Sequence, residues 1–384
     1  MIKLDNLTKI FNTPSGPIVA AENVSMDVPE GEICILLGPS GCGKTTALKM
    51  VNRLIPKTSG KIFIGGKDTD GIDVTELRRN IGYVIQQIGL FPNMTVVDNV
   101  CVVPDLLGWD RRKSRTRAKE LLELVNLDPA IFVDRFPKEL SGGQQQRVGV
   151  ARALAADPPV MLMDEPFGAI DPINREVIQD EFLKMQKTLR KTIMFVSHDI
   201  DEAVKMGDKI AIFRAGRLVQ YDSPDNVLAH PKDSFVADFV GSDRTLKRLR
   251  LISVAEAMLK VPAVTAETAL EEVTAILRDG GHEAAIVVDA DGRTDGFVSS
   301  EIAESRRGLV GDHRSRLPAT VDVDADLRTA VSLMFTHDIG WLACTDGEGR
   351  YKGIVTQPGI THLLGRTYGA SSRRAPTAPA MATD

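Results

Sequence analysis

The chain has few cysteines, few aromatic residues and no excess of positive charge. Its 384 residues include four cysteines with no Cys-x-x-Cys pair, and aromatic residues make up 5% of the sequence. Scattered cysteines argue against a disulfide scaffold or a zinc ribbon and fit the reduced thiols of a cytoplasm. A formal net charge of −5 provides no basic field, so we expect no nucleic acid partner.

Long apolar runs are also missing. None approaches the ~20 residues that cross a bilayer, and the first residues do not read as a signal peptide. If the protein works at a membrane, another subunit must supply the channel.

A glycine-rich turn with G-x-x-x-x-G-K-[ST] spacing follows an apolar run at residues 32–37, which reads as a buried strand, and precedes a helical pattern at 46–51. The turn and the first helical residue are Gly38, Pro39, Ser40, Gly41, Cys42, Gly43, Lys44, Thr45 and Thr46. Backbone N–H groups and a helix N-terminus bind phosphate at such a turn. We expect Lys44 to contact the β- and γ-phosphates of a nucleotide, and Thr45 to offer its hydroxyl to Mg²⁺.

Two carboxylates, Asp164 and Glu165, follow a second apolar run at residues 160–163. A central parallel strand would deliver both groups at its carboxyl end. There Asp164 would hold the Mg²⁺ shell, and Glu165 would polarise the attacking water as general base. A helix cap or a solvated acidic pair is the alternative, which the phosphate loop upstream disfavours.

A third motif starts at Leu140 and reads Ser141, Gly142, Gly143, Gln144 before a helical pattern that continues to residue 154. A helix start with small residues can form a second anion site, although a capping serine alone is common. With the two motifs upstream and downstream of it, residues 1–240 resemble the nucleotide-binding subunit of an ABC transporter. The resemblance implies an α/β P-loop NTPase cassette with a helical signature subdomain at about 88–158.

The resemblance also implies roles that spacing alone does not identify. It implies that Phe11 stacks on adenine and that Gln86, with Gln87 as a neighbouring candidate, contacts Mg²⁺ and the water. It implies that Asp171 lies in a loop at the dimer interface and that His198 contacts the γ-phosphate. The signature would consist of Ser141, Gly142, Gly143 and Gln144. In this family the signature contacts the ATP bound by the other subunit, so ATP favours a closed dimer. The helical subdomain of the family also accepts a helix of the transmembrane permease, and residues 90–94 would lie near that contact.

The sequence changes character after residue 240, where 241–251 reads as a linker. Beyond it is an internal repeat with an offset of 57 residues, so that Leu270 matches Leu327 and Gly296 matches Gly353. Each copy predicts an amphipathic helix, an apolar strand (284–288 and 341–344), an acidic turn, a second strand and a helix. The repeat resembles tandem CBS domains at 252–306 and 310–366, with a plain dimerisation module as the alternative. The tail at 367–384 is expected to be disordered.

CBS pairs often bind adenosine nucleotides through a hydroxyl and an aspartate after the second strand. This chain departs from that pattern, because the first copy has Ser299 with Glu301 and the second has Thr356 with Pro358. Ordinary AMP or ATP binding is therefore in doubt. A cyclic dinucleotide such as cyclic di-AMP and ionic strength both stay open as signals.

A cassette followed by tandem CBS domains, together with residues 80–92, 163–175 and 243–248, is similar to ATPase subunits of glycine betaine, carnitine, choline and proline betaine importers. The resemblance implies a peripheral ATPase at the cytoplasmic face of the membrane. Its implied partners are permease subunits, a substrate-binding protein and a second ATPase subunit, identical or paired. An importer for another amino acid or amine is the alternative. A soluble ABC ATPase of DNA repair or translation is disfavoured, because neither a coiled-coil or zinc insertion nor a second cassette is evident.

Overall fold

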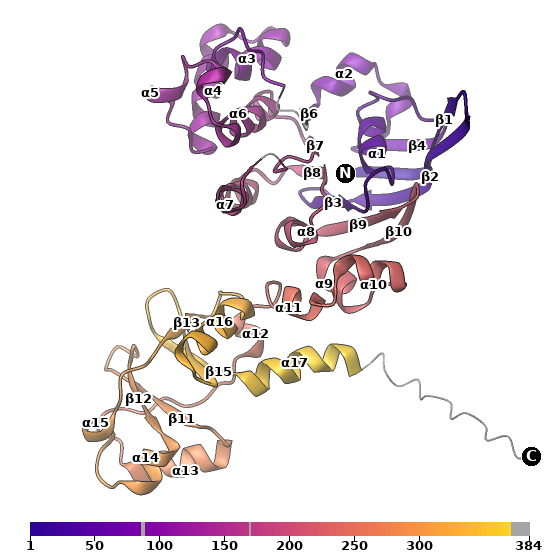
Figure 1. Ribbon diagram of the computed structural model, residues 1–384. Coiled ribbons are helices and arrows are strands. Elements are labelled where there is room, and N and C mark those ends of the chain that lie inside the picture. Colours follow the sequence, from indigo (N-terminus) through magenta and orange to yellow (C-terminus); the bar gives the residue numbers. More distant parts are fainter. Residues whose placement is uncertain (86–88, 169, 370–384) are drawn as a thin grey trace, which may run out of the picture. The chain divides into compact units, whose positions relative to one another are not determined.

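The computed structural model describes residues 1–85, 89–168 and 170–369 (Figure 1). The chain divides into two compact units, 1–241 and 242–384. Within the described residues, no helix combines the length and the hydrophobicity that crossing a bilayer requires.

A largely parallel sheet forms the centre of the first unit. Its strand order is β10-β9-β3-β8-β7-β6, and only β10 runs antiparallel to its neighbour. The strands are β3 (Ile33–Leu37), β6 (Ile81–Val84), β7 (Val160–Asp164), β8 (Thr192–Val196), β9 (Lys209–Arg214) and β10 (Arg217–Asp222). Every residue of β3, β7 and β8 is buried, as expected of parallel strands covered on both faces. The strand predicted at 32–37 is therefore β3, and its carboxyl end leads into the glycine-rich turn.

A second, antiparallel sheet has the order β2-β1-β4-β5. Its strands are β1 (Ile2–Thr13), β2 (Gly16–Val28), β4 (Ser59–Ile64) and β5 (Lys67–Asp68). Leu4 and Val24 from this sheet share one hydrophobic cluster with Leu36 of β3 and with Leu48 of α1 (Lys44–Val51). The helix that follows the glycine-rich turn is thus held by both sheets.

The other helices form two groups. A lobe of four helices lies to one side of the sheets in Figure 1 and comprises α3 (Val96–Leu106), α4 (Arg111–Leu124), α5 (Pro129–Phe132) and α6 (Gly142–Leu154). The remaining helices of the unit are α2 (Val74–Arg79), α7 (Pro172–Leu189), α8 (Ile200–Met206), α9 (Pro224–Ala229) and α10 (Ser234–Val240). Helix α3 is capped at its start by Thr95 and ends at Leu106, and Gly108 adopts a φ of 74° in the turn beyond it.

The second unit repeats its elements at the offset found in the sequence. Helices α13 (Leu270–Gly280) and α16 (Leu327–His337), strands β11 (Ala284–Val288) and β14 (Trp341–Thr345), and strands β12 (Thr294–Ser299) and β15 (Tyr351–Thr356) have corresponding bounds. The other elements are α11 (Arg244–Arg248), α12 (Val254–Ala257), α14 (Ser300–Ser305), α15 (Val310–His313), β13 (Thr320–Asp322) and α17 (Gln357–Gly369). The segment predicted as a linker contains α11, and α17 runs three residues into the segment predicted as a tail.

The packing of the two copies is crossed. Val254 and Ala257 of α12, in the first copy, lie in the hydrophobic cluster around Leu327 and Leu342 of the second. Conversely, Val310 of α15 lies in the cluster of the first copy. Each copy therefore completes the core of the other, and neither copy can bury its apolar face alone.

Candidate nucleotide-binding site

A pocket of about 490 Å³ opens at the carboxyl ends of the parallel strands. Ala20 of β2 lines it together with residues from the two motifs and from the loop after β8: Ser40, Gly41, Cys42, Gly43, Lys44, Thr45, Thr46, Glu165 and His198. Carboxyl ends of parallel strands are the usual ligand site of an open α/β sheet. Ala20 was not predicted, since nothing in its sequence context marks it.

Two glycines of the loop lie too close to other backbone for any side chain. A Cβ on Gly43, whose φ is 104°, would lie 2.1 Å from the carbonyl oxygen of Ala20. A Cβ on Gly38 would lie 2.2 Å from the carbonyl oxygen of Phe213. The loop backbone can adopt this path only with glycine at both positions.

Lys44 is buried at the first residue of α1. Its ammonium donates hydrogen bonds to the carbonyl oxygens of Gly38 (2.6 Å) and Pro39 (3.0 Å). The residue before it, Gly43, has no side chain to cap the helix, so the N-terminal N–H groups of α1 are left for a ligand. The loop combines a fixed cation with an open helix start, which is what phosphate binding requires.

The two side chains predicted to hold Mg²⁺ lie together. The Thr45 hydroxyl donates a hydrogen bond of 2.9 Å to Oδ1 of Asp164, whose side chain is almost fully buried at the end of β7. Burial raises the pKa of the Asp164 carboxyl, and the Thr45 hydrogen bond counters part of that rise. Hydroxyl and carboxylate oxygens suit Mg²⁺, which is commonly bound by one or two protein oxygens together with phosphates. Among the described residues, no group of three or more His, Cys, Asp or Glu side chains is arranged to hold a metal ion.

Glu165 and His198 face each other across the pocket. Nδ1 of His198 lies 3.7 Å from Oε2 of Glu165, and Glu165 adopts a φ of 47°, which is uncommon for a residue with a side chain. Its backbone N–H donates to the carbonyl of Val196 at the end of β8, which fixes the turn. Phe167, two residues on, packs edge-to-face on Phe182 (5.9 Å between ring centroids) and on Phe195 (6.3 Å). The local strain is thus supported by a buried aromatic cluster.

The signature lies at the start of α6 in the helical lobe. Ser141 accepts a hydrogen bond from the Gln144 N–H (3.3 Å), and the Gln144 side chain accepts one from the Ser141 N–H (2.9 Å). This reciprocal capping box fixes the helix start. Ser141, Gly142, Gly143 and Gln144 do not line the pocket around the phosphate loop.

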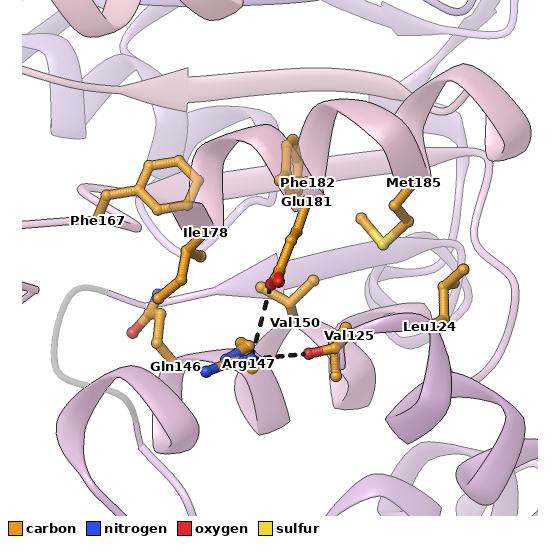
Figure 2. Close-up of a pocket in the computed structure, with 10 residues that line it drawn as sticks. All are labelled: Leu124, Val125, Gln146, Arg147, Val150, Phe167, Ile178, Glu181, Phe182 and Met185. Atoms are coloured by element: carbon orange, nitrogen blue, oxygen red, sulfur yellow. Dashed lines mark hydrogen bonds and ion pairs between the residues drawn. The ribbon is translucent and has the colours of Figure 1, made fainter. Parts of the chain in front are cut away.

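A small apolar cavity lies between α6, α7 and the end of α4 (Figure 2). Arg147 on α6 donates to the carbonyl oxygens of Val125 (3.4 Å) and Asn126 (3.2 Å), and its guanidinium lies 3.6 Å from the Glu181 carboxylate on α7. The cavity, of about 20 Å³, has room for about one water molecule. Arg147 therefore connects three helices, including the helix that begins with the signature.

The remaining predicted residues are scattered. Phe11 lies on β1, about one-third exposed, with the Lys9 ammonium 4.7 Å from its ring, and it does not line the pocket. Asp171 caps the start of α7 by accepting a hydrogen bond of 3.1 Å from the Asn174 N–H. Gln86 and its alternative Gln87 lie outside the described residues.

The second unit has a cleft of its own, of about 400 Å³. Both copies contribute to its lining: Leu259, Gly280, Gly281, His282, Glu283, Ala284, Gly340, Trp341, Ile354, Thr356, Pro358, Gly359 and His362. Neither lysine nor arginine is among these residues. The cleft offers apolar side chains and two histidines, and its charged side chain is Glu283.

Comparison with known proteins agrees with this geometry. Residues 21–168 match the ABC transporter family and residues 310–365 match the CBS domain family. The osmoprotectant import ATP-binding protein OsmV of Salmonella typhimurium is 54% identical over 96% of this chain and 97% of its own. The glycine betaine/carnitine/choline transport ATP-binding protein OpuCA of Bacillus subtilis is 44% identical over 95% and 96%. Among solved structures, the ATP-binding cassette MJ0796 in a dimeric post-hydrolysis state bound to ADP and Pi matches with a TM-score of 0.53 and 36% identity, over 58% of this chain and 99% of that one.

A phosphate loop, an acid pair at a strand end and a helical lobe in which α6 begins at the signature residues 141–144 define an ABC-type ATPase. The near full-length relatives go further: the chain belongs to the ATP-binding subunits of osmoprotectant ABC importers, and it carries a CBS domain.

Proposed function

We propose that this chain hydrolyses ATP to power uptake of quaternary-amine osmoprotectants such as glycine betaine, carnitine, choline and proline betaine. The observation that carries the proposal is the similarity along nearly the whole chain to subunits named for that uptake, at 54% and 44% identity. Cargo is selected by other subunits of such systems, so the test must be made in cells. A strain lacking this chain should lose uptake of radiolabelled betaine, carnitine or choline at high osmolarity, and Lys44→Ala should fail to restore it. If the uptake of betaine, carnitine and choline is unchanged and the uptake of another amine or amino acid is lost, that other solute is the cargo.

In the proposed mechanism Lys44 and the N–H groups of the loop bind the β- and γ-phosphates, and Thr45 and Asp164 would hold Mg²⁺. Mg²⁺ supplies charge neutralisation on the phosphates when bound. Glu165 acts as general base toward water, and His198, which is 3.7 Å from it, contacts the γ-phosphate. Phe11 stacks on adenine, and Gln86 is the residue that the family resemblance assigns to contacts with Mg²⁺ and the water, which it would make with both bound.

We propose that the second half of each site comes from another ATPase subunit. The support is that the signature residues 141–144 do not line this chain's own phosphate pocket, while the matched cassette is dimeric. Asp171 would then lie at the interface between the two subunits, which are identical or paired. The complex would sit at the cytoplasmic face of the membrane with permease subunits and a substrate-binding protein. Co-purification of membrane permease subunits with the tagged chain, in place of ribosomes or DNA, tests this arrangement.

We propose that the CBS pair regulates the ATPase by binding cyclic di-AMP. The lining of the cleft in the second unit includes the apolar side chains of Trp341 and Ile354, which suit a purine, and no lysine or arginine for a triphosphate. Two phosphodiesters carry less charge than ATP, so the cyclic dinucleotide fits this lining better. Calorimetric titration with cyclic di-AMP, AMP and ATP tests the choice. Activity that responds to salt while cyclic di-AMP fails to bind would favour ionic strength as the signal, and no response to either would favour a dimerisation module.

A further inference from the structure

A buried carboxylate lies directly beneath the loop that carries His198. Glu202, on α8, is 7% exposed. Its two oxygens accept hydrogen bonds from different elements: Oε2 from the Ser197 hydroxyl, and Oε1 from the amide of Gln179 on α7 at 2.9 Å. The catalytic scheme above does not use this group.

Both neighbours of His198 in the sequence are tied to this cluster. The Ser197 hydroxyl also accepts a hydrogen bond of 3.1 Å from the Asp199 N–H. The Asp199 carboxylate in turn caps α8 by accepting from the N–H groups of Asp201 (2.8 Å) and Glu202 (3.4 Å). The backbone on each side of His198 is thus fixed from below.

His198 itself has little to hold it. Its side chain is 65% exposed, and the acid that faces it is Glu165, at 3.7 Å. An exposed imidazole samples several rotamers unless its backbone is fixed. The direction of His198 therefore depends on residues 197 and 199.

Keeping a carboxylate at this depth costs free energy. Burial raises the pKa of the Glu202 carboxyl, and the hydrogen bonds from Ser197 and Gln179 counter part of that rise. A glutamine or an apolar residue would avoid the desolvation cost. The carboxylate has the capacity to accept from both donors at once, which matches its two partners.

We propose that Glu202 is a positioning residue of the ATPase, which orients His198 toward the γ-phosphate through Ser197 and anchors that loop to α7 through Gln179. The proposal rests on the role proposed above for His198. Glu202 does not line the phosphate pocket, so we expect its loss to lower turnover and to leave the ATP affinity unchanged.

The test uses the full-length chain with four variants: Glu202→Gln, Ser197→Ala, His198→Ala and the double variant of Glu202→Gln with His198→Ala. Asp201→Asn is the matched control, because Asp201 is exposed on the same helix one residue away. Single-turnover hydrolysis of radiolabelled ATP measures hydrolysis rates that are too slow for a steady-state assay. Equilibrium binding gives the ATP affinity, and thermal melting reports whether each variant is folded.

We expect Glu202→Gln and Ser197→Ala to lower the hydrolysis rate about tenfold or more with less than a twofold change in ATP affinity, and Asp201→Asn to match the wild type. In the His198→Ala background, Glu202→Gln should cause no further loss, because its effect passes through the imidazole. An additive loss in the double variant, or a wild-type rate for folded Glu202→Gln, would overturn the positioning role. A wild-type rate for His198→Ala would instead overturn the role proposed for His198 itself.

Discussion

Glu165 is held in a backbone conformation that costs free energy, in a turn supported by the aromatic cluster around Phe167. Such support places a carboxylate where it faces both His198 and the phosphate loop. We predict that Glu165→Gln lowers the hydrolysis rate at least ~100-fold, since the water loses its base, while ATP affinity stays near that of the wild type. Rate and affinity are measured by phosphate release and by equilibrium binding. Turnover close to wild type would show that another group is the base.

Gly43 offers a second prediction at the scale of one residue. Gly43→Ala should destabilise the loop by at least ~1 kcal/mol, because the left-handed backbone disfavours a side chain and the methyl group would meet the Ala20 carbonyl. ATP affinity should fall with it. Gly71→Ala is the control, since a Cβ there meets no atom within 4 Å. Equal melting temperatures and affinities for the two variants would contradict the geometry.

Single residues also show what the sequence can and cannot reveal. Lys44, Thr45, Asp164 and Glu165 could be picked out because their chemistry depends on fixed spacing within one loop or at one strand end. Ala20 could not, because it joins the pocket through backbone proximity across more than twenty residues of chain. Glu202 could not either, because a glutamate in the first turn of a helix is ordinary until its burial is known.

At the scale of elements, the contact between α6 and α7 joins the signature helix to the rest of the cassette (Figure 2). Nε of Arg147 and Oε2 of Glu181 are buried without a hydrogen-bond partner among the described residues, although the two groups attract each other at 3.6 Å. Removing either side chain would leave the charge of the other one buried without a counter-charge.

We therefore predict that Arg147→Ala lowers the free energy of unfolding by about 2 kcal/mol, since it leaves the Glu181 carboxylate without its cation and the end of α4 without two hydrogen bonds. Urea unfolding of the full chain measures the loss. Arg117→Ala is the control, because Arg117 pairs with the exposed acids Glu120 and Asp157, and its loss should cost less than ~1 kcal/mol. A loss for Arg147→Ala no greater than that of the control would remove the connecting role.

Elements of the second unit were predictable where the pattern repeats. The strand predicted at 284–288 matches β11, and the copy at 341–344 matches β14 to within one residue. The crossed packing of α12 and α15 was not predictable, because hydrophobic periodicity indicates that a face is buried without indicating which partner buries it.

At the scale of the whole molecule, the two units have separate hydrophobic clusters. We predict that a chain ending at residue 241 folds and binds ATP with an affinity near that of the full chain, while any response to cyclic di-AMP or salt is lost. Circular dichroism and nucleotide titration measure the two properties. A shortened chain that fails to fold would show that the second unit stabilises the first.

Assembly provides the last prediction. The helix start at Ser141 is fixed by its own capping box, and residues 141–144 are absent from the lining of this chain's phosphate pocket. If a second copy supplies them, ATP that cannot be hydrolysed should hold two copies together, because only the closed dimer makes both sets of phosphate contacts. We expect Glu165→Gln to shift from monomer to dimer on addition of MgATP, but not MgADP, in light scattering. Adding Ser141→Arg should abolish the shift without lowering ATP affinity in the monomer. ATP-bound Glu165→Gln that stays monomeric at all concentrations would mean that identical chains do not form the closed dimer and that a different ATPase subunit must complete the site.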